Sequence, residues 1–275
     1  MSADEILIQE RHMRVKRCRH GPMLYNPTDT FIGRSLDLYG EFSEFESVLF
    51  TQILKPGMVA IDVGANIGCF TVPMAKRVGP NGLVVAIEPQ RVIYQTLCAN
   101  VALNALENVL TVHAAAGTEE GSIIVPQVNY SDGGNFGGVE LGGNEKGEQV
   151  PVTMLDALPL DGCHLIKIDV EGMECEVIEG AKEIIDKFQP VLYVENDRKE
   201  KSEALVEQLL ASDYRLFLKG PLLFNPDNFF GNTDNVFGGV GSFNLICLTK
   251  SHNSRLASSI EITSPNDRYP PFFYD

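Results

Sequence analysis

Acidic residues stand at the ends of three apolar runs in this chain, where a carboxylate can bind a ligand or handle a proton. They are Asp62 in the run 59–63, Glu88 after 83–87, and Asp169 with Glu171 after 165–168. Acids are rarely buried without partners, so their position beside buried runs requires an explanation. In an open α/β sheet the strand ends line the ligand crevice, which favours binding or catalysis. Capping of the following helices, or pairing with surface lysines, is the alternative.

A glycine turn follows the first run, at residues 64–68. Gly64 permits a tight turn, and Gly68 lets a new helix approach the sheet or a ligand closely. Glu88 comes twenty residues after Gly68, where a carboxylate accepts hydrogen bonds from a ribose diol. The spacing lacks the third glycine of the dinucleotide fingerprint. It therefore predicts an adenosine cofactor without saying which one, and glycines that serve packing alone are the alternative.

Strand-like and helix-like segments alternate around these acids, which is typical of parallel strands joined by right-handed crossovers. The expected strands are 58–63, 83–87, 109–114, 165–169, 191–195, 214–218 and 243–248. The expected helices are 43–54, 66–78, 91–103, 172–187 and 199–211. The pattern predicts an α/β fold with a mostly parallel sheet.

Composition divides the chain into three parts. Residues 1–54 are expected to form a small cap of short strands and a helix, 55–250 one α/β domain, and 251–275 a polar, exposed tail. The domain contains a glycine-rich loop at 129–148. A loop of this length inside a compact domain is usually functional, so we expect a mobile substrate loop or lid.

The charge of the chain limits its partners. A formal net charge of -15 and a pI near 4.7 argue against nucleic acid or an anionic membrane as the main partner. The basic segment 11–20 is an exception, for which an edge strand protected by its charges is favoured over a contact with an anionic substrate.

Six cysteines without a CxxC pair predict reduced thiols. An acidic start and the lack of an apolar run of ~20 residues predict a cytoplasmic protein.

Two blocks of the sequence, residues 55–68 and 165–174, together resemble the FkbM family of S-adenosylmethionine-dependent methyltransferases. The resemblance extends from about Tyr39 to about Cys247. It implies a Rossmann-like class I methyltransferase fold, with a seven-stranded, mostly parallel sheet whose last two strands form an antiparallel pair. It also implies O-methylation of a hydroxyl on a sugar, polyketide or other secondary metabolite, with a small-molecule or glycan acceptor. A cofactor-binding module without turnover and an NAD-dependent oxidoreductase are the alternatives. An oxidoreductase is expected to carry Gly-x-Gly-x-x-Gly and Tyr-x-x-x-Lys motifs, which we do not find.

The resemblance also implies which residues bind the cofactor. At its methionine end these are Asp62, Gly64, Asn66 and Gly68, covered by Tyr39 and Glu41. The ribose and adenine are expected at Glu88, Pro89 and Ala115. A sulfonium cation beside several carboxylates is electrostatically favourable, which agrees with this cofactor.

Asp169 is the first candidate for catalysis, because it ends a strand near the methyl group that the resemblance implies. It is expected to contact the cofactor and either to take the acceptor's hydroxyl proton or to orient the acceptor. Glu171 is the second candidate. Asp169, Glu195 and Asn196 could instead gather a magnesium ion through oxygen ligands. Since the motif around Asp169 resembles the FkbM motif, we expect no metal.

Overall fold

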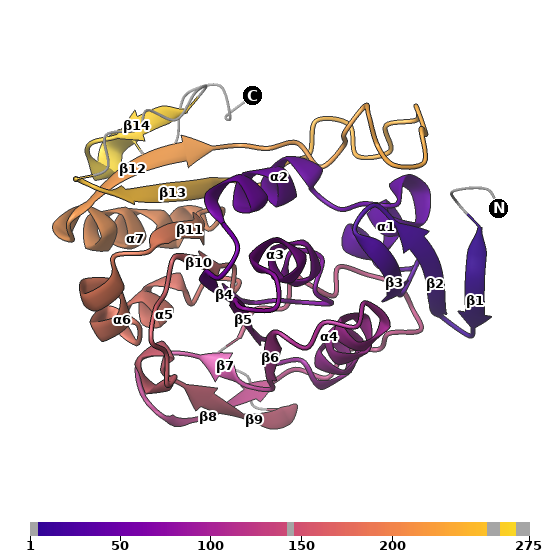
Figure 1. Ribbon diagram of the computed structural model, residues 1–275, viewed down its shortest axis with the longest axis horizontal. Coiled ribbons are helices and arrows are strands. Elements are labelled where there is room, and N and C mark those ends of the chain that lie inside the picture. The colour runs from indigo at the N-terminus through magenta and orange to yellow at the C-terminus, as the bar shows by residue number, and fades with distance from the viewer. Residues whose placement is uncertain (1–4, 142–145, 252–258, 268–275) are drawn as a thin grey trace.

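The computed structural model describes residues 5–141, 146–251 and 259–267. Its main strands are β4 (Val59–Val63), β5 (Leu83–Ile87), β6 (Val109–Val112), β10 (Leu165–Ile168), β11 (Val191–Glu195), β12 (Tyr214–Lys219), β13 (Asn244–Thr249) and β14 (Ile260–Ile262). They form one sheet in the order β14-β12-β13-β11-β10-β4-β5-β6 (Figure 1). The consecutive strands β11, β10, β4, β5 and β6 pair in parallel with one another, whereas β13 is antiparallel to both of its neighbours, β11 and β12. The expected mostly parallel sheet with an antiparallel pair is confirmed.

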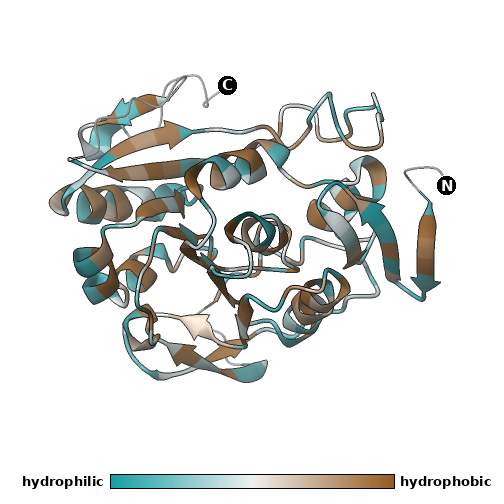
Figure 2. Cartoon of the chain, in the orientation of Figure 1, coloured by the Kyte–Doolittle hydropathy of each residue, from teal (hydrophilic) through white to brown (hydrophobic). Residues whose placement is uncertain are grey.

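Helices cover both faces of this sheet, because the strands carry apolar side chains on both sides. On one face lie α2 (Glu44–Ile53), α3 (Thr71–Val78) and α4 (Arg91–Leu103), and on the other α5 (Glu174–Glu179), α6 (Lys182–Phe188) and α7 (Lys199–Ala211). Successive residues of β4 divide between them, with Ala60 packing toward α2 and α3 and Ile61 toward α5 to α7. The strands of the sheet are accordingly hydrophobic in Figure 2.

A small sheet and a short helix precede this core. They are β1 (Ile6–Glu10), β2 (Met13–Cys18), β3 (Gly21–Tyr25) and α1 (Ile32–Tyr39). The basic segment lies mainly in β2, which is the central strand and not the expected edge strand. Two of its charges are paired locally: Arg14 Nη1 lies 2.5 Å from Asp37 Oδ1, and Lys16 Nζ donates to the Asp37 carbonyl at 2.9 Å. Helix α1 was not expected, and Asp29 Oδ1 accepts the N–H of Phe31 at its start.

A second small sheet has the order β7-β9-β8 and comprises β7 (Ala115–Ala116), β8 (Gly121–Val125) and β9 (Glu148–Thr153). The glycine-rich loop 129–148 connects β8 to β9, and its residues 142–145 lie outside the described part of the chain. Phe136 in this loop is buried, and its N–H donates to Asp29 Oδ2 at 3.2 Å. The described part of the loop is therefore packed against the N-terminal cap, while its mobility stays a prediction.

Three expected elements differ in extent. The helix expected from residue 66 begins at Thr71, because Asn66 and Gly68 adopt positive φ angles of 50° and 90°. The helix expected over 172–187 is divided into α5 and α6 near Gly180, where a Cβ would overlap the carbonyl oxygen of Gly117. Strand β14 lies within the segment expected to be an exposed tail. It pairs with β12 and buries Ile262 against the sheet, so the sheet has eight strands where seven were expected.

Two simpler expectations concern the whole described chain. All six cysteines are free thiols, as their spacing predicted. Among the described residues, no helix is long and apolar enough to cross a membrane.

Candidate active site

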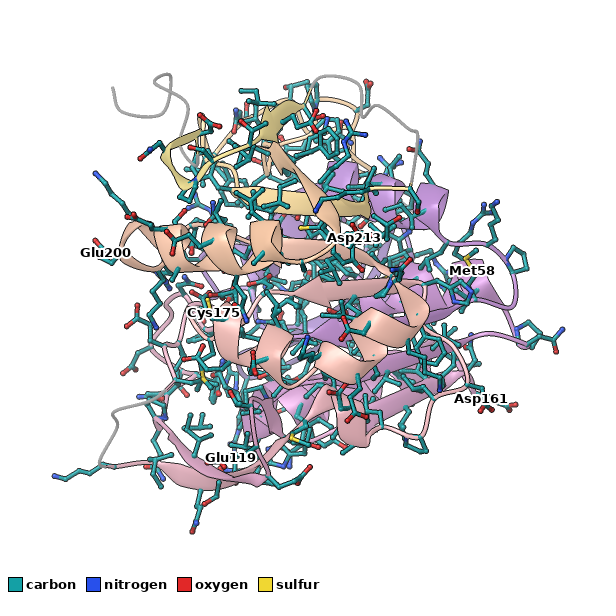
Figure 3. All side chains as sticks on the ribbon, turned by 90° about the vertical axis from the view of Figure 1, so that its left-hand side faces the viewer. Met58, Glu119, Asp161, Cys175, Glu200 and Asp213 are labelled. Carbon is teal, nitrogen blue, oxygen red and sulfur yellow. The ribbon has the colours of Figure 1, made fainter. Side chains whose placement is uncertain are left out.

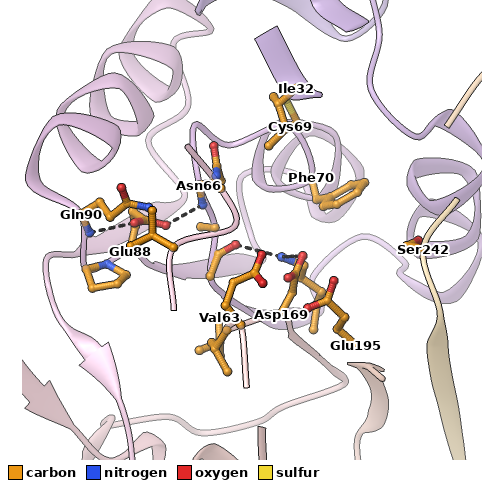
Figure 4. Close-up of a pocket in the computed structure, with 18 of the residues that line it drawn as sticks. Ile32, Val63, Asn66, Cys69, Phe70, Glu88, Gln90, Asp169, Glu195 and Ser242 are labelled. Carbon is orange, nitrogen blue, oxygen red and sulfur yellow. Dashed lines mark hydrogen bonds and ion pairs between the residues drawn. The ribbon is translucent and has the colours of Figure 1, made fainter. Parts of the chain in front are cut away.

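A cavity of about 310 Å³ lies at the carboxyl ends of β4, β5, β10 and β11 (Figure 4). Residues at or just after these strand ends that line it are Gly64, Asn66, Glu88, Asp169, Glu171 and Glu195. The opposite wall comes from the cap, the glycine-rich loop and the connection before β13, with Ile32, Asn135, Val139, Leu223, Val240 and Ser242. Ligands of open α/β sheets bind at this edge.

Glu88 is held in the cavity wall by backbone donors. Its side chain is almost fully buried, and its two oxygens accept the N–H groups of Asn66 at 2.9 Å and Gln90 at 2.8 Å. Burial raises the pKa of Glu88 to about 7. A carboxylate has about four acceptor sites, so capacity remains for ligand hydroxyl groups. Pro89 and Ala115 also line the cavity.

The glycine turn has two different functions. Gly64 has φ 73° and lies so close to β10 that a Cβ would overlap the carbonyl oxygen of Asp169. Gly64 and Asn66 both line the cavity. Gly68 does not, because it faces Leu97 of α4. For Gly68 the structure therefore favours packing over ligand contact.

Lys167 is a buried cation beneath the cavity. Its Nζ donates to the carbonyl oxygen of Gly64 at 2.9 Å and lies 3.3 Å from both Asp62 Oδ1 and Asp169 Oδ2. Burial by itself lowers the pKa of Lys167, but the two carboxylates raise it above its ordinary value, so the lysine stays charged. Asp62 is fully buried, accepts the Thr71 hydroxyl at 2.6 Å and does not line the cavity.

Three carboxylates meet at the far end of the cavity. Asp169, Glu171 and Glu195 each place one oxygen within 4.8 Å of the others. Arg198 contacts the Glu171 carboxylate and lies 3.7 Å from Asp197 Oδ1. Burial, reinforced by the Asp169 charge, raises the pKa of Glu171 to about 7 and that of Glu195 well above its usual range. The site therefore holds closely spaced acids that resist simultaneous ionisation.

Tyr39 and Glu41 do not line the cavity, although the resemblance implied that they cover the cofactor. The Tyr39 hydroxyl donates to the Asp234 carbonyl at 2.7 Å, and Asn225 Nδ2 donates to Glu41 Oε1 at 2.8 Å. Both residues instead attach the cap to the connection between β12 and β13.

Sequence reasoning missed Lys167 and Arg198 as residues of the site. A lysine inside an otherwise apolar strand is a visible signal, because a buried charge needs partners. Arg198 gave no comparable signal. Asn196, considered as a metal ligand, is buried outside the cavity lining, and Glu171 lies beside Asp169 and Glu195 instead.

The sequence model of the methyltransferase FkbM domain matches residues 62–216, more than half of the chain. The chain belongs to the FkbM methyltransferase family. The matched region contains all the acids of the cavity wall described above. The strand order and the reversed β13 are those of the class I S-adenosylmethionine-dependent methyltransferase fold, as the resemblance implied. Membership of FkbM favours methyl transfer over the NAD-dependent alternative.

Relatives of this FkbM protein match it only in part. Methyltransferase sdnD of Sordaria araneosa is 30% identical over 156 residues, which are 45% of this chain and 60% of sdnD. The tRNA(Phe) (4-demethylwyosine(37)-C(7)) aminocarboxypropyltransferase of Methanocaldococcus jannaschii is 46% identical over 75 residues, 27% of this chain and 29% of that protein. The crystal structure of methyltransferase FkbM from Methylobacillus flagellatus KT has 17% identity and a TM-score of 0.46, covering 74% of this chain and 50% of that one. The chain thus spans less than two thirds of each of them.

Proposed function

We propose that this FkbM protein transfers a methyl group from S-adenosylmethionine to a hydroxyl group of a small-molecule or glycan acceptor. The observation that carries the proposal is a single cavity with two acidic ends. One end holds the buried Glu88, and the other holds the Asp169 cluster. A ribose diol suits the first end, and a sulfonium with an acceptor hydroxyl suits the second.

The residues of the first end fit the cofactor. Backbone N–H groups fix the Glu88 carboxylate before any ligand arrives, so binding the ribose requires little ordering. We assign Gly64 and Asn66 to the methionine end, and Pro89 and Ala115 to the adenosine. Asp62 and Gly68 support the site from behind it, through Lys167 and through packing on α4.

The residues of the second end would handle the acceptor. S-adenosylmethionine, when bound, supplies an electrophilic methyl group on a sulfonium. We assign Asp169, whose side chain is 35% exposed, to take the acceptor's hydroxyl proton or to hold the acceptor in line with that methyl group. Lys167 fixes one oxygen of Asp169 and is a positioning residue. Glu171, held by Arg198, is the second candidate for contact with the acceptor.

The cavity wall supports a small acceptor. Leu223, Val240 and Val139 offer apolar surface for a ring or chain, and Asn135 and Ser242 offer polar groups. Such a mixture suits a hydroxylated sugar, polyketide or other secondary metabolite. The net charge of -15 opposes a phosphate backbone, and the match to the tRNA-modifying enzyme covers only 27% of this chain. We therefore propose no nucleic-acid substrate.

Substitution of Glu88 tests the cofactor assignment. Glu88→Ala removes a charge-assisted acceptor worth about 1.5–3 kcal/mol, so the affinity for S-adenosylhomocysteine should fall about 10- to 150-fold by calorimetry. Glu119→Ala, which removes an exposed acid (Figure 3), is the matched control and should leave the affinity unchanged. A panel of hydroxylated acceptors with labelled S-adenosylmethionine then tests turnover. Binding of NAD without binding of S-adenosylhomocysteine would refute the proposal, and binding without turnover on any acceptor would favour an inert module.

A further inference from the structure

Gln90 lies between the Glu88 end of the cavity and the glycine-rich loop. It is buried and lines the cavity. Its backbone N–H donates to Glu88 Oε1 at 2.8 Å, and Figure 4 shows the two residues next to each other. Its side-chain Nε2 donates to the carbonyl oxygen of Phe136 at 2.7 Å, and its Oε1 accepts the Tyr130 hydroxyl at 3.1 Å. Gln90 thus holds Glu88 through its backbone and the loop through its side chain.

The N-terminal cap holds the same part of the loop from another side. Asp29 Oδ2 accepts the N–H of Phe136 at 3.2 Å. Gly134 donates its N–H to the carbonyl oxygen of Thr28 at 3.2 Å and accepts the N–H of Thr30 at 2.9 Å. Hydrogen bonds to the cap and to Gln90 therefore fix the backbone around Phe136, which has its N–H on one anchor and its carbonyl group on the other.

The loop backbone around Phe136 forms part of the cavity wall. Asn135 and Gly137, its two neighbours in the chain, line the cavity, as does Val139. The loop also lies close to the turn after β4, because a Cβ on Gly137 would lie 3.0 Å from Asn66 Nδ2. Since Phe136 stands between two residues of the wall, a shift of its backbone would move both of them.

We propose that Gln90 is a positioning residue that couples cofactor binding to the shape of the acceptor wall. The inference rests on the proposed function, because it takes Glu88 as the ribose ligand and Asn135 and Val139 as acceptor contacts. Gln90 lines the cavity beside Glu88, so a nucleoside bound there favours the arrangement in which the amide holds the loop. The cofactor therefore completes the wall, and the acceptor binds more tightly in its presence.

Hydrogen exchange over residues 129–141 of the full chain tests the coupling without acceptor or turnover. Saturating S-adenosylhomocysteine should slow exchange there about tenfold in the wild type, within the usual range of coupling between two sites. Gln90→Met keeps the length of the side chain but removes both amide contacts, so it should lose most of this slowing. Its affinity for S-adenosylhomocysteine should stay nearly constant in calorimetry, because the hydrogen bond to Glu88 comes from the backbone.

Two further variants separate the amide contacts from general effects on the loop. Tyr130→Phe removes one of the two contacts from the loop side and should lose part of the slowing. The double variant should behave as Gln90→Met alone, because the two side chains form one contact. Ser131→Ala changes an exposed residue of the same loop and is the matched control, which should retain the full slowing.

Steady-state kinetics with an acceptor from the panel give a second reading. Because the coupling acts on acceptor binding, Gln90→Met should raise the acceptor KM about tenfold and change kcat much less. A residue that only stabilises the fold would lower the melting temperature and leave the acceptor KM of the folded enzyme unchanged. Thermal melting therefore accompanies each measurement, and Tyr130→Phe gives the same reading if Gln90→Met does not fold.

The outcomes distinguish the coupling from the proposed function. Equal slowing of exchange in the wild type and in Gln90→Met overturns the role of Gln90, as does an unchanged acceptor KM. Binding of S-adenosylhomocysteine with no slowing in the wild-type loop overturns the coupling alone. Slowed exchange without turnover on any acceptor supports the coupling and overturns methyl transfer. If the wild type does not bind S-adenosylhomocysteine, both proposals are wrong.

Discussion

The two acidic ends of the cavity are held in place by different means. At the β5 end, Glu88 receives both of its hydrogen bonds from backbone N–H groups close to the turns after β4 and β5. At the β10 end, Asp169 and Glu171 are held by the side chains of Lys167 and Arg198. Backbone donors persist when neighbouring side chains change, whereas side-chain partners do not. The β5 end should therefore tolerate substitution around it, and the β10 end should be sensitive.

The largest expected effect is on turnover at the β10 end. Asp169→Asn should lower turnover by about two to four orders of magnitude, the usual contribution of a positioned general base, because it removes the carboxylate that we assign to the acceptor's proton. The affinity for S-adenosylhomocysteine should stay nearly constant, since the Glu88 end is untouched. Steady-state kinetics with an acceptor from the panel, together with calorimetry, measure both. Near-normal turnover would exclude Asp169 as the base, and a lower melting temperature with normal turnover would indicate a purely structural role.

The second-largest expected effect is a loss of folding stability when the buried cation Lys167 is replaced. Lys167→Met leaves the Asp62 and Asp169 carboxylates without their shared partner, and breaking a buried ion pair in this way costs about 3–5 kcal/mol. Urea unfolding measures the loss. Lys182→Met is the control, because its exposed pair with Asp186 should contribute less than about 1 kcal/mol. Equal stability of the two variants would contradict the importance given to side-chain support at this end.

The close approach of Gly64 to the Asp169 backbone predicts a smaller loss of stability. Gly64→Ala places a Cβ against the carbonyl of Asp169 at a positive φ, which should cost at least about 1–3 kcal/mol of unfolding free energy. Gly121→Ala meets no neighbouring atom and should remain within about 0.5 kcal/mol of the wild type in the same urea titration. A tolerated Gly64→Ala would show that the turn can move away from β10.

The smallest expected effect is a pH dependence at the β5 end. Burial raises the pKa of Glu88 to about 7 from an ordinary value of 4.5, so the folded protein keeps this group protonated where the unfolded chain ionises it. Its contribution to stability is therefore lost as the pH rises toward 7. Ribose hydroxyls donate to the ionised form, so the affinity for S-adenosylhomocysteine should rise severalfold between pH 6 and 8. Glu88→Gln should show a flat profile in calorimetry, and an unchanged slope would assign the dependence to another group.

The sequence predicted the parts of the site that depend on short segments. Glu88 and Asp169 follow apolar strands, and parallel strands bring their ends to one edge, so their meeting in one cavity was foreseeable. Tyr39 and Glu41 were misplaced because their partners lie in the connection between β12 and β13, far away in the chain. Strand β14 was missed because three residues with one buried side chain give too weak a pattern.

Lys167 stands opposite Asp62 in the parallel pairing of β10 with β4. Both strands carry apolar side chains on both faces, so hydrophobic burial alone specifies their register only weakly. A two-residue slip would set Lys167 against Ala60 or Gly64 and leave two charges unpaired in a dry interior, at a cost of several kcal/mol. The ion pair beneath the cavity thus also selects the register in which the two central strands fold.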